Sequence, residues 1–188
     1  MSPSFPFTAR TQVDLLSVWN DRRNFLIGPE LITFDAKLPS SEVIVDILRQ
    51  HEDSRVQFLG MKDSDEKDAM IKKFKTAPLE QVIDMPFSLA NFFLHKFYGA
   101  GQFLQEFQRD VMIPWRTFLS STGLTWQRAY PIFFISGKNC SSSYHVDVSH
   151  VVAWQVYGVK IFNGFKDPED QAAIQHIVDN RNEYRYEI

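Results

Sequence analysis

Cysteine is nearly absent from this sequence, which has one, Cys140, in 188 residues. A single cysteine excludes an internal disulfide. The first thirty residues also lack a basic segment followed by an apolar stretch, which is the pattern of a secretory signal. Together these two absences predict a protein of a reducing compartment, and we expect it in the cytoplasm.

Long apolar runs and a strong excess of one charge are absent as well. No apolar run approaches the roughly 18 residues that a membrane-spanning helix needs, so no membrane partner is expected. The formal net charge is -3, and the lysines and arginines are scattered along the chain rather than gathered in one segment. Binding driven by the phosphate backbone of a nucleic acid is therefore not expected.

The sequence does contain an ample supply of apolar residues. Hydrophobic residues make up 44% and aromatic residues 14% of the 188. That is enough for one globular domain with a core, and the chain is too short to expect two. We therefore predict a single domain over residues 1–188. Mostly helical segments run to about residue 125 and short β-rich runs follow, which predicts a fold of the α+β class.

Three segments of the first part predict helices, beside a short strand-like piece within 24–34. Residues 65–75 and 87–109 predict two of the helices, the second interrupted by glycines. Residues 40–52 predict the third, with Ser40 or Ser41 as the N-cap. Its apolar face comprises Val43, Ile44, Ile47 and Leu48.

The second part reads mainly as β-strands separated by polar or glycine-containing turns. Four runs have this character, namely residues 130–136, 142–149, 151–156 and 159–165. Residues 168–179 predict a helix opened by Pro168, and residues 183–188 a last strand.

A His-x-Asp pattern occurs twice, at His51 and Asp53 and again at His145 and Asp147. Residues two apart on a helix point about 200° away from each other, whereas on a strand they share a face. Only His145 and Asp147, which lie in a predicted strand, could therefore chelate one ion. We interpret His51 and Asp53 as the solvated end of a helix.

Lys160 is placed by the turn that precedes it. Residues 151–156 and 159–165 predict two strands joined by a tight turn at Tyr157 and Gly158, so Lys160 begins the returning strand. A lysine buried beside a metal site needs an anion, because an uncompensated ammonium in a dry cavity is costly. A dicarboxylate would supply that anion. The alternative is that Lys160 points to water from a sheet edge.

Residues 142–162, SSYHVDVSHVVAWQVYGVKIF, resemble the metal-binding segment of the JmjC and cupin-like Fe(II)/2-oxoglutarate oxygenases. The closest resemblance is to their protein hydroxylase branch, which includes the asparaginyl hydroxylase of hypoxia-inducible factor. That family has His-x-Asp at the end of one strand, a glutamine near the end of the next, and Gly-x-Lys at the start of a third. The residues at these spacings are His145, Asp147, Gln155, Gly158 and Lys160.

The resemblance implies a set of site residues and a reaction. His145 and Asp147 would be ligands of Fe(II), and Lys160 would pair with the distal carboxylate of 2-oxoglutarate. Ser142 matches a hydroxyl that reaches the same carboxylate, and Phe134 matches an apolar position that lines the cosubstrate pocket. Such an enzyme uses O2 to convert 2-oxoglutarate to succinate and CO2 while it hydroxylates a C–H bond of a protein side chain or a small molecule.

The implied fold is a double-stranded β-helix, the jelly-roll or cupin core, preceded by a mostly helical N-terminal region. Residues 1–125 would form that region and 126–188 the first part of the barrel. Asp147, where demethylases of the family more often carry glutamate, favours hydroxylation. Val151 departs from the family, whose closest members have a polar asparagine near the cosubstrate.

A third metal ligand is missing from the pattern. A facial triad needs two histidines and one carboxylate. His150 lies three residues from Asp147 and would face the opposite side of a strand, while His95 and His176 lie in predicted helices. We therefore expect the chain to be either a fragment whose barrel is incomplete at the C-terminus or an exceptional member of the family, and to be inactive by itself.

Two alternatives stay open beside the oxygenase. One is a non-catalytic cupin-fold binding module with an incomplete triad, in which Lys160 binds another anion. The other is a cupin metalloenzyme that needs no cosubstrate, although Gly-x-Lys counts against it. Aromatic residues at loosely helical spacing favour a core or a homodimer face over a ligand site; they are Phe92, Phe93, Phe97, Phe103 and Phe107.

Overall fold

The computed structural model describes residues 6–19, 24–58, 61, 64–142, 147 and 149–163. The chain divides into two compact units, one made of residues 1–55 and 89–135, the other of residues 56–88 and 136–188. Helices and short strands alternate along it, so the fold is mixed α+β, as predicted. The helix predicted over 168–179 and the strand predicted over 183–188 lie outside the described residues.

The first unit opens with a strand, a helix and a second strand. β1 (Phe7–Ala9) and β2 (Phe25–Ile27) pair in parallel. Between them, α1 (Gln12–Val18) begins with a capping box. The backbone N–H of Asp14 donates to the Thr11 hydroxyl, and the Asp14 carboxylate accepts from the backbone N–H of Thr11. These bonds satisfy donors that the first helical turn would otherwise leave unpaired.

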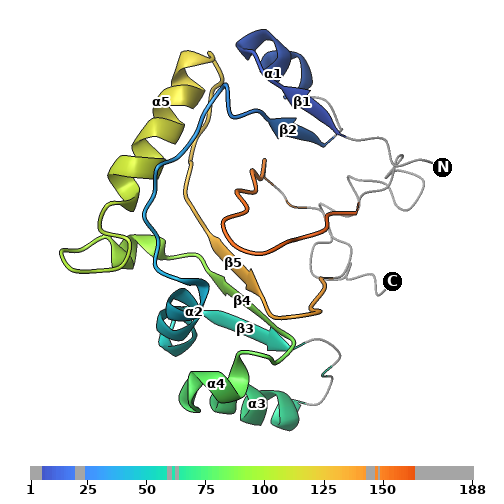
Figure 1. Ribbon diagram of the computed structural model, residues 1–188, viewed down its shortest axis with the longest axis vertical. Helices are drawn as coiled ribbons and strands as arrows, with labels where there is room; N and C mark the ends of the chain where they lie inside the picture. The colour runs from blue at the N-terminus through green and yellow to red at the C-terminus, as the bar shows by residue number, and fades with distance from the viewer. Residues whose placement is uncertain are drawn as a thin grey trace. The chain divides into compact units, whose positions relative to one another are not determined.

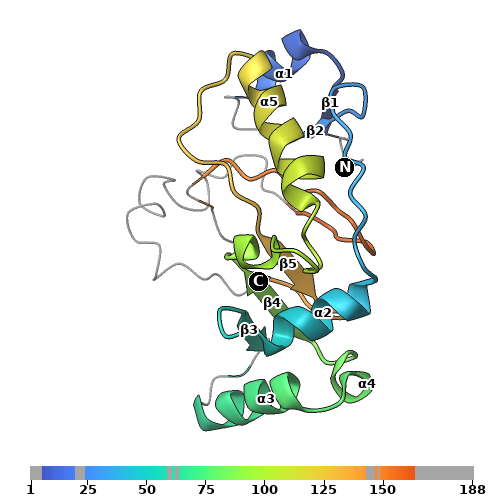
Figure 2. The same ribbon diagram turned by 90° about the vertical axis from the view of Figure 1, so that its left-hand side faces the viewer.

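The last helix of the first unit, α5 (Ile113–Ser121), lies beside α1 (Figure 1, Figure 2). The side-chain amide of Gln12 donates to the backbone carbonyl of Ser121 at 2.7 Å. α5 follows a short π-helix, η2 (Gln108–Met112), and Pro114 explains this change of register. Pro114 has no N–H to continue the α-helical pattern, while Ile113 donates five residues back, to the Gln108 carbonyl.

Helix α2 (Ser41–Gln50) confirms the amphipathic helix predicted over 40–52, and Ser40 is its N-cap. Its buried face differs slightly from the prediction. Ile44, Val45 and Leu48 are buried, whereas Val43, expected on that face, is 46% exposed. The buried face of α2 is therefore shifted around the helix by about one residue from the predicted face.

Three further strands form a sheet in the order β3 (Arg55–Phe58), β4 (Phe87–Asn91) and β5 (Phe133–Ser136) (Figure 1). Buried and exposed side chains alternate along β3, and β4 follows the same period of two. β5 confirms the strand predicted over 130–136.

The helix predicted over 87–109 is wrong. The segment begins with β4, continues through a 3-10 turn, η1 (Leu94–Phe97), and reaches η2 only at Gln108. Phe87, Leu89 and Asn91 are all buried, which requires side chains two apart to share a face. A strand provides this arrangement, whereas a helix would turn such residues about 200° apart.

In the second unit, α3 (Ser64–Thr76) confirms the helix predicted over 65–75, and α4 (Leu79–Val82) follows it. Phe74 on α3 is fully buried. Its ring lies 5.8 Å from that of Phe58 and 4.5 Å from that of Phe87. Gly137 packs so close to the backbone of Met85 and Phe87 that a Cβ there would collide with the Met85 carbonyl.

No residue of 149–163 belongs to a strand, although two strands were predicted there, and every residue of this stretch is exposed. A strand exists only where a neighbouring segment supplies the hydrogen bonds of a ladder, and β-propensity does not supply that neighbour. The chain does bend at Tyr157 and Gly158, as predicted, and Gly158 has a positive φ of 69°.

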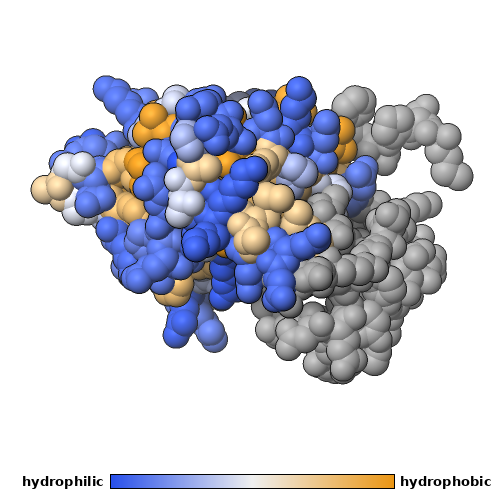
Figure 3. Space-filling model, turned by 90° about the horizontal axis from the view of Figure 1, so that it is seen from below, coloured by the Kyte–Doolittle hydropathy of each residue, from blue (hydrophilic) through white to orange (hydrophobic). Residues whose placement is uncertain are grey.

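Among the described residues, no helix is both long and apolar enough to cross a membrane. The face drawn in Figure 3 is mainly hydrophilic, with apolar side chains in scattered groups between charged ones.

Phe74 provides a test of the second unit's core. We predict that Phe74→Ala lowers the free energy of unfolding by about 3–5 kcal/mol, because it removes a fully buried ring and leaves a cavity between two others. Phe74→Leu keeps most of the volume and should cost clearly less. Urea unfolding of both variants measures the difference; equal, small losses would contradict this packing.

Candidate functional site

Three of the predicted iron and 2-oxoglutarate residues are described in the second unit. Ser142, Asp147 and Lys160 are all exposed, and His145 lies outside the described residues. No hydrogen bond or ion pair joins these three described residues to one another. The structure therefore leaves the carboxylate of Asp147 and the ammonium of Lys160 accessible to a ligand, without forming a closed pocket around them.

Lys160 interacts with Phe162 and Cys140 among the described residues of the second unit. Its Nζ lies 5.8 Å from the centroid of the Phe162 ring. Its positive charge also acts on Cys140: burial raises the pKa of the Cys140 thiol, and the charge of Lys160 opposes that rise. A thiol with a raised pKa is a poor nucleophile at neutral pH, so Cys140 is not an activated cysteine.

Phe134 belongs to the first unit and lies on β5, where its side chain is 58% exposed. Its ring meets that of Phe92 edge-on, with centroids 6.0 Å apart and an interplanar angle of 83°. The guanidinium of Arg55 lies on Phe92 in turn, 4.8 Å from the ring centroid.

The donor chemistry of His145 and Asp147 suits Fe(II), which accepts imidazole and carboxylate ligands. Within the described ranges, however, no three His, Cys, Asp or Glu side chains come together in a way that could hold a metal ion. The predicted pair therefore supplies two ligands of a triad, and the described residues offer no third one near Asp147.

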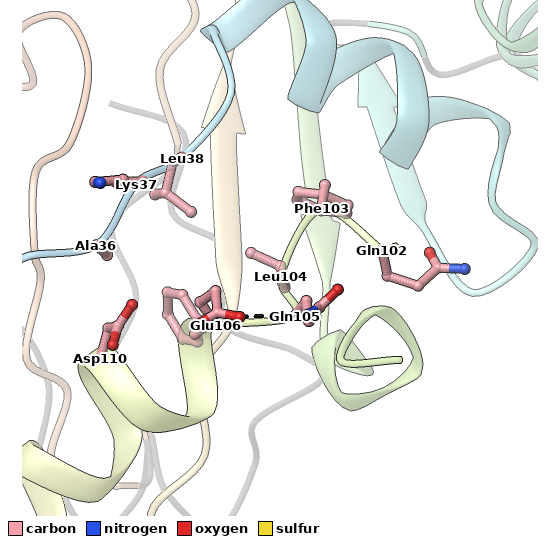
Figure 4. Close-up of a pocket in the computed structure, with 10 residues that line it drawn as sticks. Ala36, Lys37, Leu38, Gln102, Phe103, Leu104, Gln105, Glu106 and Asp110 are labelled. Carbon is pink, nitrogen blue, oxygen red and sulfur yellow. Dashed lines mark hydrogen bonds between the residues drawn. The ribbon is translucent and has the colours of Figure 1, made fainter. Parts of the chain in front are cut away.

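A hollow of about 230 Å³ lies in the first unit (Figure 4). Apolar side chains of Leu104 and Phe107 meet charged ones at its edge. Arg109 forms ion pairs with both Glu106 and Asp110, so the two acids share one guanidinium. The residues that line the hollow are Ala36, Lys37, Leu38, Gln102, Phe103, Leu104, Gln105, Glu106, Phe107 and Asp110.

An ion-pair cluster ties the end of α2 to η1. Lys96 pairs with Asp53, and Glu52 lies 3.9 Å from the same ammonium. The hydrogen bond from Lys96 lowers the pKa of the Asp53 carboxyl, and the charge of Lys96 acts in the same direction. Nδ1 of His51 accepts from the backbone N–H of Asp53 at 3.3 Å. His51 and Asp53 are thus part of a structural link at the end of α2, where the sequence predicted only a solvated helix end.

A buried amide lies next to this cluster. Asn91 is fully buried, and its Nδ2 donates to the hydroxyl of Ser54 at 3.0 Å. Its Oδ1 accepts from the backbone N–H of Phe93 at 2.9 Å. Both ends of the amide are satisfied, as a buried polar group requires. Asn91 therefore fixes the start of β3 to the end of β4.

Sequence reasoning missed both Asn91 and Arg55. The signal for Asn91 was present: a polar residue at an inward position of the alternating run Phe87, Leu89, Asn91. That alternation was hidden by the phenylalanines that follow at helical spacing. No sequence feature marks Arg55, because its role depends on which strand becomes its neighbour.

No protein-family model, curated protein or solved structure matches this chain. The function is therefore argued from the residues of the chain itself.

The Asp53–Lys96 pair predicts a pH dependence of stability. Because the folded pKa of Asp53 is lowered, its contribution is present above the unfolded pKa and lost as the pH falls through the folded value. We expect Asp53→Asn to be less stable than the wild type at pH 7, and the difference to shrink as the pH is lowered below about 4. Urea unfolding across this range measures it, with exposed Asp35→Asn as control. A pH-independent difference would contradict the ion pair.

Asn91 and Ser54 predict an energetic coupling. Asn91→Ala leaves the Ser54 hydroxyl and the Phe93 N–H without their partner, and we expect a loss of roughly 2–4 kcal/mol. Ser54→Ala leaves one amide donor unpaired and should cost roughly 1–3 kcal/mol. The double variant should lose clearly less than the two single losses combined, since one bond is removed in both. Additive losses in urea unfolding would rule out the bond.

Proposed function

We propose that this chain belongs to an Fe(II)- and 2-oxoglutarate-dependent oxygenase, with residues from 126 onward contributing to a double-stranded β-helix. The proposed reaction is hydroxylation of a C–H bond of a protein side chain or a small molecule, with release of succinate and CO2. The observation that carries this proposal is the combined order and spacing of His145, Asp147, Gly158 and Lys160.

Three features of the described residues support it. The Asp147 carboxylate enters no ion pair within the described ranges and is exposed, so it is available to a metal ion. Lys160 likewise has no acidic partner there, which leaves its ammonium available to a carboxylate. The bend at Gly158, whose positive φ suits glycine, lies two residues before Lys160 and is where the pattern expects a turn.

In this proposal the protein supplies binding and orientation. His145 and Asp147 would hold the ion through an imidazole nitrogen and a carboxylate oxygen. Lys160 would hold the distal carboxylate of 2-oxoglutarate through a charge-assisted hydrogen bond, and the Ser142 hydroxyl would donate to the same carboxylate. The bound iron, with O2, supplies the oxidising chemistry.

Binding of 2-oxoglutarate tests the proposal without requiring turnover. In anaerobic calorimetric titrations we expect 2-oxoglutarate to bind in the presence of Fe(II). Lys160→Ala should weaken this binding at least roughly tenfold, because a charge-assisted contact is lost. Lys138→Ala removes an exposed lysine of the same unit that has no role in the proposal and serves as the matched control.

The metal ligands are tested in the same titration. His145→Ala should abolish the Fe(II)-dependent binding of 2-oxoglutarate, whereas His150→Ala should leave it unchanged. If neither Lys160→Ala nor His145→Ala changed the binding of 2-oxoglutarate, the proposed oxygenase function would be rejected. Anion binding that depends on Lys160 but on no metal would favour the non-catalytic module instead.

A further inference from the structure

Arg55, Phe92 and Phe134 form a row across one side of the three-stranded sheet, and we name it the Arg–Phe row. Arg55 begins β3, Phe92 follows the last residue of β4, and Phe134 lies on β5, so the row crosses three neighbouring strands (Figure 1). The spacings along it are 4.8 Å from the guanidinium carbon to the Phe92 centroid and 6.0 Å from there to the Phe134 centroid.

The guanidinium of Arg55 has hydrogen-bonding capacity to spare. Arg55 is exposed and takes part in none of the ion pairs of the described residues, unlike Arg10, Arg49 and Arg109. Contact with an aromatic face leaves the N–H donors at the edge of the guanidinium free. These donors form a fork that suits a carboxylate.

Two buried residues adjacent in the chain to Arg55 and Phe92 hold the Arg–Phe row in place. Ser54 and Asn91, whose side chains hydrogen-bond to each other, directly precede Arg55 and Phe92 in the chain. Both are buried, so the backbone that carries the cation and the ring is fixed. Contacts that are already ordered lose less conformational entropy when a ligand binds.

We propose that the Arg–Phe row binds an extended peptide segment in which an acidic side chain stands two residues from an aromatic or large aliphatic one. In an extended peptide, side chains two residues apart share a face and lie roughly 6.5–7 Å from each other. An acidic side chain on Arg55 thus places its second neighbour just beyond Phe92, from where an aromatic or large aliphatic side chain can reach the exposed ring of Phe134. The row includes neither of the predicted iron ligands, and it shares Phe134 with the predicted cosubstrate pocket.

Labelled heptapeptides test this proposal by fluorescence anisotropy. The probe is Ser-Gly-Glu-Ser-Phe-Gly-Ser, and its matched variants carry Gln for Glu, Ser for Phe, or the Glu and Phe side by side. We expect the original to bind best and the Gln variant to bind roughly tenfold or more weakly, since it loses a charge-assisted pair. These comparisons leave the protein unchanged, so they hold even if a protein variant fails to fold.

Variants of the protein locate the site. Arg55→Gln should remove the preference for Glu over Gln, and Phe134→Ser the preference for Phe over Ser. Arg128→Gln and Phe7→Ser, which change an exposed arginine and an exposed phenylalanine of the same unit, should change neither. Equal binding of the Glu and Gln peptides to the wild type would overturn the proposal. Competition by acetate or benzoate as strong as by the peptide itself would also overturn it, in favour of a small-anion site.

Discussion

The buried amide of Asn91 is the interaction on which the centre of the first unit depends. It hydrogen-bonds at one end to the Ser54 side chain and at the other to the Phe93 backbone. An amide without partners in a dry interior is costly, so both bonds stabilise the folded form of this segment. No buried side-chain nitrogen or oxygen of the described residues lacks a partner.

Around this amide, the three consecutive residues 53–55 each contact the segment 91–96, and each does so through a different kind of interaction. Asp53 forms an ion pair with Lys96, Ser54 accepts a hydrogen bond from Asn91, and Arg55 places its guanidinium on Phe92. The buried contact lies between the two exposed ones. The ion pair and the cation–aromatic contact are each modest in solvent. The hydrogen bond beneath fixes their geometry, which explains how an exposed arginine can be held ready for a ligand.

Local signals made some elements predictable. Ser40 before an apolar stripe identified α2, and the charged, Gly-free run 65–75 identified α3. The prediction for residues 87–109 failed because phenylalanines at helical spacing obscured the strand pattern of β4, in which every second side chain from Phe87 to Asn91 is buried. Such an alternating segment forms a strand only when neighbouring strands are present, and the sequence alone does not show which strands will pair.

The two candidate sites also differ in how far the sequence could predict them. The iron residues were predictable as a pattern, because ligand chemistry imposes spacing within one segment, and that pattern is still a prediction. The Arg–Phe row draws single residues from three distant segments and has no local signature. It follows from the sheet order β3-β4-β5, which sequence reasoning did not reach.

Hydrogen exchange at the backbone N–H of Phe93 tests the central role of Asn91 most directly. The Phe93 side chain is 43% exposed, so burial of the ring does not explain protection of its amide. If Asn91 holds this N–H as described, the amide should exchange far more slowly than in an unstructured peptide, and Asn91→Ala should remove that protection. Fast exchange in the wild type, or protection that survives Asn91→Ala, would contradict the account.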